Sequence, residues 1–134
     1  MKNNAPCELS SNMEDYLEAI VMLKEEKGVA RVQDVSRLLN VKAPSATGAL
    51  NFLSEKGYVV HEPYGHIEFT PKGKKIATQV YERHTMLTRF LISVLGVDHE
   101  TAEEDACKME HTMSEQSFGK LKKFLKKNGK LVRG

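Results

Sequence analysis

Three residues toward the C-terminal end of the sequence carry side chains that can bind a metal ion. They are Cys107, Glu110 and His111 in the segment "CKMEH", which supply a thiol, a carboxylate and an imidazole. Residues three and four apart share one face of an α-helix, so a helical segment would present these groups together. Glu103, four residues before Cys107, would extend the same face. One helix alone seldom completes a coordination sphere, so a metal site needs donors from elsewhere in the chain.

Two other places offer such donors. Asp15 and Glu18 stand three residues apart, and His84 lies within "YERHTML". Carboxylates near a helix N-terminus also interact well with the helix dipole, and a lone cysteine is commonly a small buried apolar residue. As a set, however, several carboxylates would repel one another unless a cation neutralised them. Carboxylates and imidazole suit Mn²⁺ and Fe²⁺, whereas a thiolate favours Fe²⁺, Co²⁺ or Zn²⁺.

The composition is that of a soluble globular protein. The 134 residues suffice for one ordinary domain or two small ones, with 40% hydrophobic and 28% charged residues. No segment has the ~20 consecutive apolar residues of a membrane span, and no apolar signal-peptide run opens the chain. We therefore expect a cytoplasmic protein with no membrane partner. Residues 98–110 are acidic and residues 120–133 are basic, which suggests one cationic and one anionic partner, or solvated helix faces.

The first half of the chain has the pattern of a winged helix-turn-helix. Helices are expected over 10–28, 31–40 and 41–57, the first with a capping box of Ser11 and Glu14 and an end at Gly28. Residues 58–70 then alternate around "PYG", which is typical of a β-hairpin. Two short helices joined tightly and followed by a hairpin describe this DNA-binding motif. Further helices are expected over 72–95, 100–114 and 115–127.

The helix that begins near Ala43 would be the recognition helix. Its hydroxyl groups and N-terminus suit phosphate oxygens, Asn51 could read an adenine edge, and Gly48 would let the backbone come close to DNA. The hairpin tip and the basic "PKGKK" segment at 71–75 would lie near the duplex backbone. The candidate DNA-binding residues are Lys42, Ala43, Pro44, Ser45, Thr47, Gly48, Asn51, Tyr64 and His66.

Five segments together resemble the diphtheria-toxin-repressor family of metal-dependent transcriptional regulators, which includes the manganese transport regulators. They are "MEDYLEAI", "NVKAPSATGAL", "FTPKG", "YERH" and "ACKMEHTMS", and the resemblance runs from Asn12 to Leu125. It implies a mainly α fold with a small β-hairpin wing. A winged helix-turn-helix DNA-binding domain would occupy residues 1–71, and a helical dimerisation and metal-binding domain residues 72–134. The length is similar to that of the short, manganese-type members.

The resemblance implies a metal-ligand set with features of two subfamilies. Manganese-type members typically have a glutamate where Cys107 stands, and iron-type members lack the acidic pair found here. Glu103 stands where iron-type members have a histidine of a secondary site, so it is a further candidate ligand, whereas Thr88 replaces an acidic residue of that site. We therefore expect Mn²⁺ or Fe²⁺, one or two ions per subunit. The implied ligands are Asp15, Glu18, His84, Cys107, Glu110 and His111.

The resulting hypothesis is a homodimeric repressor that binds double-stranded DNA at a near-palindromic operator when metal is present. The family implies that the target genes serve metal uptake. The alternative is a metal-independent winged-helix regulator that responds to a small ligand or to oxidation of Cys107. An enzyme with Cys107 as nucleophile is not expected, because residues four apart on a helix point the same way and no glycine-rich oxyanion loop is near. No small-molecule substrate is expected either.

Overall fold

A computed structural model describes residues 10–62 and 65–128 of the chain. These residues form two compact units, 10–80 and 81–128, which are described separately. The predicted wing residue Tyr64 and the last two basic residues, Lys130 and Arg133, lie outside the described part of the chain. The fold is mainly α-helical with one two-stranded antiparallel sheet, which confirms the predicted fold class. No described helix is long and apolar enough to cross a membrane.

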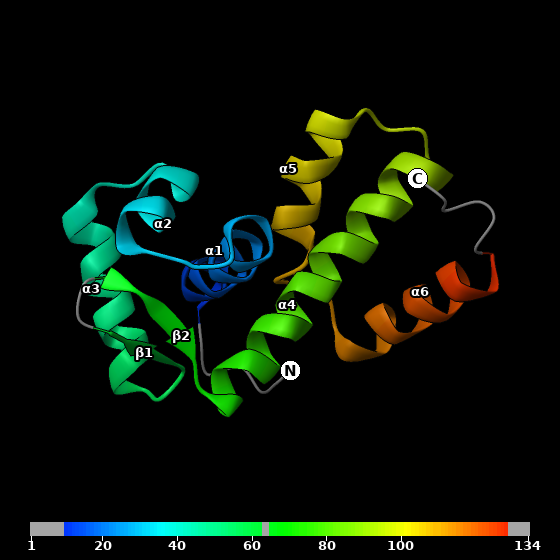
Figure 1. Ribbon diagram of the computed structural model, residues 1–134. Coiled ribbons are helices and arrows are strands. Elements are labelled where there is room, and N and C mark those ends of the chain that lie inside the picture. The colour runs from blue at the N-terminus through cyan, green and yellow to red at the C-terminus, as the bar shows by residue number, and fades with distance from the viewer. Residues whose placement is uncertain (1–9, 63–64, 129–134) are drawn as a thin grey trace. The chain divides into compact units, whose positions relative to one another are not determined.

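The first unit is a winged helix-turn-helix, as the sequence predicts. Three helices come first, followed by an antiparallel hairpin and the first part of a long helix (Figure 1). The elements are α1 (Ser11–Lys27), α2 (Val32–Leu39), α3 (Ala43–Glu55), β1 (Val59–His61), β2 (Ile67–Phe69) and α4 (Pro71–Arg89).

The ends of α1 follow from its capping residues. The Ser10 side chain accepts a hydrogen bond from the backbone N–H of Met13 at 3.2 Å, which satisfies one of the free donors of the first turn. The predicted cap at Ser11 is therefore wrong by one residue. Gly28 ends the helix as predicted, with φ +85° and its N–H bonded to the carbonyl of Lys24, a left-handed conformation that glycine adopts at little cost.

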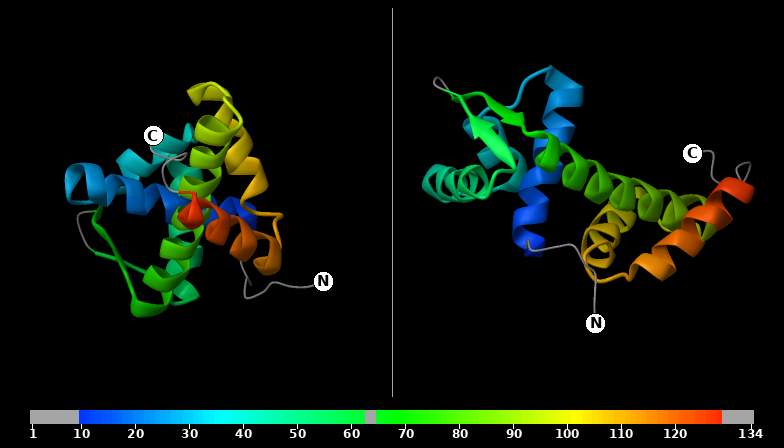
Figure 2. Two further views of the ribbon diagram at one scale, coloured as in Figure 1. Left: turned by 90° about the vertical axis from the view of Figure 1, so that its right-hand side faces the viewer. Right: turned by 90° about the horizontal axis from the view of Figure 1, so that it is seen from below.

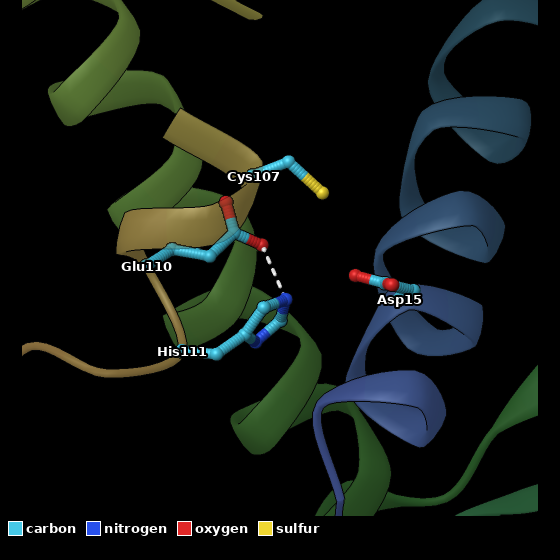
Figure 3. A group of neighbouring side chains, drawn as sticks. All are labelled: Asp15, Cys107, Glu110 and His111. Atoms are coloured by element: carbon cyan, nitrogen blue, oxygen red, sulfur yellow. Dashed lines mark ion pairs between the residues drawn. The ribbon is translucent and has the colours of Figure 1, made fainter. Parts of the chain in front are cut away.

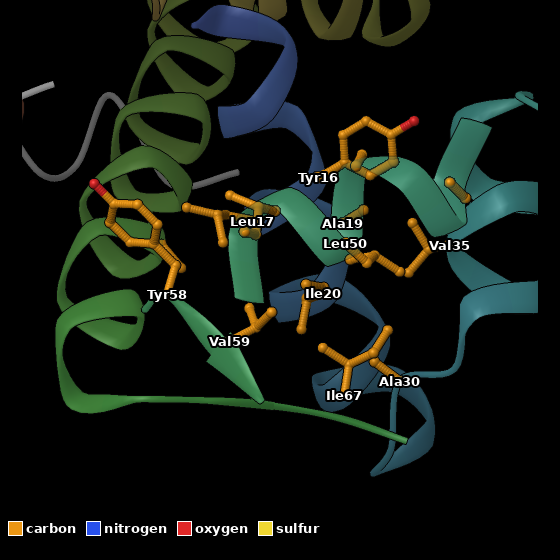
Figure 4. Packing of buried hydrophobic residues seen from close by; sticks show 14 of the residues in the cluster. Tyr16, Leu17, Ala19, Ile20, Ala30, Val35, Leu50, Tyr58, Val59 and Ile67 are labelled. Atoms are coloured by element: carbon orange, nitrogen blue, oxygen red, sulfur yellow. The ribbon is translucent and has the colours of Figure 1, made fainter. Parts of the chain in front are cut away.

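The core of this unit joins α1, α3 and the hairpin. Leu17, Ile20, Leu50, Leu53 and Ile67 are all fully buried, and Figure 4 shows members of this cluster pointing toward one another from the helices and strands. Burying a side chain of this kind contributes about 1.5–3 kcal/mol. The apolar face of α1 thus holds α3 in place, which leaves the opposite face of α3 free to project outward.

The hairpin is tied back to the segment before α2. Val59 pairs with Phe69 and His61 with Ile67, and the strands lie side by side in Figure 2. Beyond the hairpin, the N–H of Ile67 donates to the carbonyl of Ala30 at 2.9 Å, and Arg31 bridges antiparallel to His66. These bonds fix the base of the wing relative to the helix-turn-helix.

The segment "FTPKG" joins the hairpin to α4. The Thr70 hydroxyl donates to the carbonyl of Gly57 at 2.6 Å and accepts from the N–H of Gly73 at 3.0 Å. The ammonium group of Lys72 donates to the carbonyl of Lys56 and lies 4.5 Å from the ring centroid of Tyr58. Lys72 is thus held against the protein, although the sequence interpretation places it near the DNA backbone.

The second unit contains the rest of α4, the π-helical segment η2 (Phe90–Val94), α5 (His99–Met109) and α6 (Glu115–Lys127). Its core is formed by Leu87 and Leu91 with Ala102 and Ala106. Two predicted boundaries are wrong. The helix predicted over 72–95 ends in a π-helical turn, and the helix predicted over 100–114 ends at Met109. Ser114 caps α6, its side chain accepting from the N–H of Ser117 at 3.0 Å, and its extended backbone keeps α5 from continuing into α6.

Asp98 caps α5, the helix that carries the predicted ligands. Its carboxylate accepts a hydrogen bond from the N–H of Thr101 at 3.0 Å. This bond holds the pKa of the Asp98 carboxyl below its ordinary value.

Replacing Gly73 should destabilise the first unit. A Cβ at this position would lie 1.7 Å from the carbonyl oxygen of Tyr58, so α4 must shift away from the strand. We expect Gly73→Ala to lower the free energy of unfolding by about 1–3 kcal/mol or more, the usual range for overpacking. Urea unfolding measures this change. Gly48→Ala is the matched control, because nothing lies within 4 Å of its Cβ. This control should gain up to about 1 kcal/mol of helix propensity. Equal effects of the two substitutions would contradict the packing described here.

The cap at Asp98 should make stability depend on pH. Because the folded-state pKa is lowered, the cap contributes stability above the unfolded-state pKa of about 3.9 and loses it as the pH falls through the folded-state value. The melting temperature of Asp98→Ala should therefore lie below that of the wild type at neutral pH, with the gap closing in acid. Thermal melts of both proteins in chelator, from neutral to acidic pH, measure this difference in melting temperature. Asp98→Asn, an uncharged cap, is the control. A gap that stays constant with pH would contradict a charged cap.

Candidate metal centre

The end of α5 brings three predicted ligands together. Cys107 lies in the last turn of the helix, Glu110 is its C-cap, and His111 follows in the next turn. A ligand atom from each lies within 4.8 Å of those of the other two, and Figure 3 shows the three side chains on one side of the chain. The sequence predicted His111 on the helix, but it lies just beyond the helix end. It stays in the group because Glu110 keeps helical backbone angles, φ −62° and ψ −27°.

His84 on α4 lies between two carboxylates. Its Nδ1 is 2.8 Å from Oε1 of Glu110, and its Nε2 is 2.8 Å from Oε1 of Glu103. The His84 side chain is 12% exposed. A protonated ring can donate to both carboxylates, whereas a neutral ring can donate to only one. A metal ion held by one ring nitrogen would replace one of these contacts, and the other carboxylate could then orient the ring.

Glu110 is the most deeply buried carboxylate of the cluster. The residue is 2% exposed, and its Oε2 has no hydrogen-bond partner among the described residues, although Nε2 of His111 lies 3.4 Å away. Withdrawing a carboxylate oxygen from water without a partner is costly. A divalent cation would neutralise this charge and accept lone pairs from the carboxylate oxygens. The thiol, carboxylate and imidazole donors around it therefore fit a transition metal ion.

The two α1 carboxylates belong to the first unit. Asp15, also drawn in Figure 3, is half-buried, and Glu18 is buried with 6% exposure. Their spacing places them on one face of α1, and a buried glutamate normally has a partner. Their membership of the ligand set stays a prediction.

At the positions of the secondary site, Glu103 is acidic and Thr88 is uncharged. Glu103 contacts His84, and its other oxygen, Oε2, lies 3.9 Å from Nε2 of His99. Thr88 is buried, and its hydroxyl oxygen has no hydrogen-bond partner within the described part of the chain. A hydroxyl group brings no negative charge, so Thr88 lacks the charge of the acidic residue that iron-type members have at this position.

The recognition helix presents its predicted DNA-binding positions outward. Seven of these positions are exposed, while Ala46, Ala49 and Leu50 are buried on the opposite face of α3. The helix therefore has one face in the core and one exposed face, and contact of the exposed face with DNA stays a prediction. The exposed positions are Lys42, Ala43, Pro44, Ser45, Thr47, Gly48 and Asn51.

Two arginines with clear structural roles escaped the sequence analysis. Arg31 places its Nη2 2.9 Å from Nε2 of His66, the predicted wing residue, which is half-buried. Arg83, the residue before His84, donates to carbonyl groups in the turn after α5. Neither contact can be predicted from local sequence patterns, because each joins residues that are far apart in the chain.

Comparison with known proteins finds a family match for each half of the chain. Residues 8–67 match the family model described as iron dependent repressor, N-terminal DNA binding domain. Residues 70–130 match that of the iron dependent repressor, metal binding and dimerisation domain.

Individual relatives support the same assignment. An uncharacterized HTH-type transcriptional regulator of Methanocaldococcus jannaschii is 38% identical over 120 residues, 89% of this chain and 96% of that protein. The HTH-type transcriptional regulator MntR of Bacillus pumilus is 41% identical over 110 residues, 82% of this chain and 76% of MntR. The solved structure of the manganese regulator SloR matches with a TM-score of 0.75 and 27% identity, covering 88% of this chain and 55% of that one. The chain thus spans about half the length of that solved regulator.

The predicted resemblance is therefore confirmed: the chain belongs to the iron-dependent repressor family of metal-dependent, DNA-binding transcriptional repressors.

Proposed function

We propose that this chain forms a cytoplasmic homodimer that represses metal-uptake genes when Mn²⁺ or Fe²⁺ is bound. In this state the dimer binds a near-palindromic operator. We place the functional boundary between the DNA-binding and dimerisation domains at residues 71 and 72, close to the gap between the two family matches.

The observation that carries the metal dependence is the buried carboxylate of Glu110. It is 2% exposed, and one of its oxygens has no hydrogen-bond partner in the described part of the chain. Around it stand an imidazole on α4 and a thiol and a second imidazole from the end of α5. A cation is the natural partner for such a group.

The proposed ligand set joins both units of the chain. Asp15 and Glu18 of α1 would complete the coordination that begins with the second unit's donors. Glu103, which contacts His84, would hold a second ion or orient His84, so one or two ions per subunit are proposed. The proposed ligands of the second unit are His84, Cys107, Glu110 and His111.

The switch follows from charge. A bound metal supplies positive charge that lets carboxylates approach one another. Without it, Asp15 and Glu18 would repel Glu110, which would leave the winged helix free to move relative to the dimerisation unit. With it, these side chains would be ligands of one ion, and this would fix the spacing of the two recognition helices in the dimer. Half-sites in neighbouring major grooves lie about 34 Å apart, so only a fixed spacing matches the operator. Coupling between such sites is typically about 1–3 kcal/mol.

DNA contact would come from the exposed face of α3 and from the wing. The small and hydroxyl-bearing side chains at its N-terminal end allow close approach to phosphate groups. Tyr64 and His66 are proposed to contact the DNA backbone next to the phosphates bound by α3. Arg31 would orient His66, because its Nη2 lies 2.9 Å from Nε2 of His66. Few long side chains are available to read bases, so DNA shape should contribute to recognition.

The metal identity depends on Cys107. Its thiolate favours Fe²⁺ relative to Mn²⁺, while the carboxylates accept either ion. A metal-independent regulator that responds to oxidation of Cys107 is not favoured by the family assignment. The chain belongs to a family of transcriptional regulators, and we assign it neither a catalytic activity nor a small-molecule substrate.

DNA binding should require metal. We expect mobility shifts with Mn²⁺ or Fe²⁺ and weaker binding, by about 5–150-fold, in chelator. The duplexes are selected from a random-sequence library in parallel with Mn²⁺ and with chelator. Gly48→Ala is the control for the DNA face, because its added methyl group meets no protein atom and should weaken DNA binding while metal affinity is kept. Equal DNA binding with and without metal would rule out the switch.

Substitution of Cys107 should change metal preference and leave the metal response in place. Cys107→Glu removes the soft donor, so the ratio of Mn²⁺ to Fe²⁺ affinity should rise. Calorimetric titration of each ion into anaerobic protein measures that ratio. Cys107→Ser serves as the control for oxidation, because a redox sensor would lose its peroxide response while its metal affinities stay the same. Loss of the peroxide response with unchanged metal affinities would favour the metal-independent regulator that responds to oxidation of Cys107.

A further inference from the structure

Arg83 links α4, the turn after α5 and the start of α6. Its Nη1 donates to the carbonyl of Glu110 at 3.0 Å and to that of Met113 at 2.7 Å. Its Nη2 lies 3.6 Å from Oε2 of Glu115, and its guanidinium carbon is 5.1 Å from the ring centroid of Phe118. One side chain, 16% exposed, therefore contacts three residues of the stretch 110–115 and the ring of Phe118 in the first part of α6.

These contacts supply hydrogen-bond donors to carbonyl groups that have no partner within their own helix. The last carbonyl groups of a helix have no intrahelical partner, and a positive charge near them is favourable. Glu110, the C-cap of α5, provides such a carbonyl, and Met113 provides another in the turn that leads to α6. The planar fork of an arginine can donate to several acceptors while its face packs on an aromatic ring, which a lysine ammonium cannot reproduce.

Arg83 and His84 act on the same residue from neighbouring positions. Arg83 binds the main-chain carbonyl of Glu110, and His84 binds its side-chain carboxylate at 2.8 Å. His111, the next residue along the turn, is therefore held at its N-terminal side by the Arg83 contact to Glu110. The orientation of two proposed ligands thus depends on a residue that is not itself a donor to metal.

We propose that Arg83 is a positioning residue of the metal centre, which holds the turn at 110–113 so that Glu110 and His111 face the ion before it binds. This inference rests on the proposed metal-dependent function. Partners that orient metal ligands commonly contribute about 10–100-fold to metal affinity, and a turn ordered in advance costs less to fix on binding.

A purely structural role would have a different signature. If Arg83 only joins α4 to α6, its loss should lower the stability of the metal-free protein and leave the metal affinity of the folded protein unchanged. The pair of Glu82 and Lys122, 2.7 Å apart, joins the same two helices without touching the turn. Glu82→Gln is therefore a matched control for the loss of a link between α4 and α6.

The experiment compares Arg83→Lys, Arg83→Met and Glu82→Gln with the wild type. Calorimetry gives the Mn²⁺ and Fe²⁺ affinities, and hydrogen exchange in chelator reports the protection of the amides at 110–114. Both Arg83 variants should bind metal about 10–100-fold more weakly and exchange faster in this turn. Glu82→Gln should match the wild type in both measurements. Thermal melts in chelator show that each variant is folded.

Several outcomes overturn the inference. Unchanged metal affinity in folded Arg83 variants would overturn it while the proposed function stands. Loss of the fold in both Arg83 variants would assign the residue a structural role and overturn it as well. A wild-type chain that binds neither Mn²⁺ nor Fe²⁺ would overturn the proposed function, and this inference with it.

Discussion

The arrangement of the second unit depends on the burial of a single negative charge. Glu110 is almost completely withdrawn from water, and two histidines near its carboxylate can offset part of the cost of burying it. His84 contacts one carboxylate oxygen at 2.8 Å, while His111 stands 3.4 Å from the other. This arrangement leaves the charge partly compensated within the described residues. A site in that condition gains more from a divalent ion than an exposed acidic cluster does, because little water competes for the carboxylate.

The scaffold around this carboxylate comes from ordinary helix chemistry. The alanines at 102 and 106 pack α5 against Leu87 of α4 and Leu91 of η2, and the cap at Asp98 fixes where α5 begins. Ser114, with an extended backbone, caps α6 and separates it from the turn that carries Glu110 and His111. Consecutive residues of α4 then hold that turn, Arg83 through the main chain and His84 through a side chain. Metal chemistry is thus placed at the end of one helix by a neighbouring helix.

The sequence predicted the elements better than their ends. The hairpin and the helix over 115–127 follow from alternation and from apolar spacing, and both are confirmed. The end of α5 was missed because the 3.6-residue pattern continues through His111, while the cap at Ser114 that interrupts it depends on the next helix. The π-helical end of α4 has no sequence pattern that distinguishes it from an ordinary last turn. The contacts of Arg31 and Arg83 were missed because long-range partners leave no local signal.

The central claim is that a divalent ion binds at the buried carboxylate of Glu110. Anomalous diffraction from crystals of the full chain grown with Mn²⁺ or Fe²⁺, with data collected on both sides of the metal absorption edge, tests this claim most directly. The account predicts an anomalous peak within ligand distance of the Glu110 carboxylate and of donors on Cys107 and His111, with Asp15 or Glu18 completing the shell. A fully occupied metal at another place in the chain, with Glu110 left unbound, would contradict it.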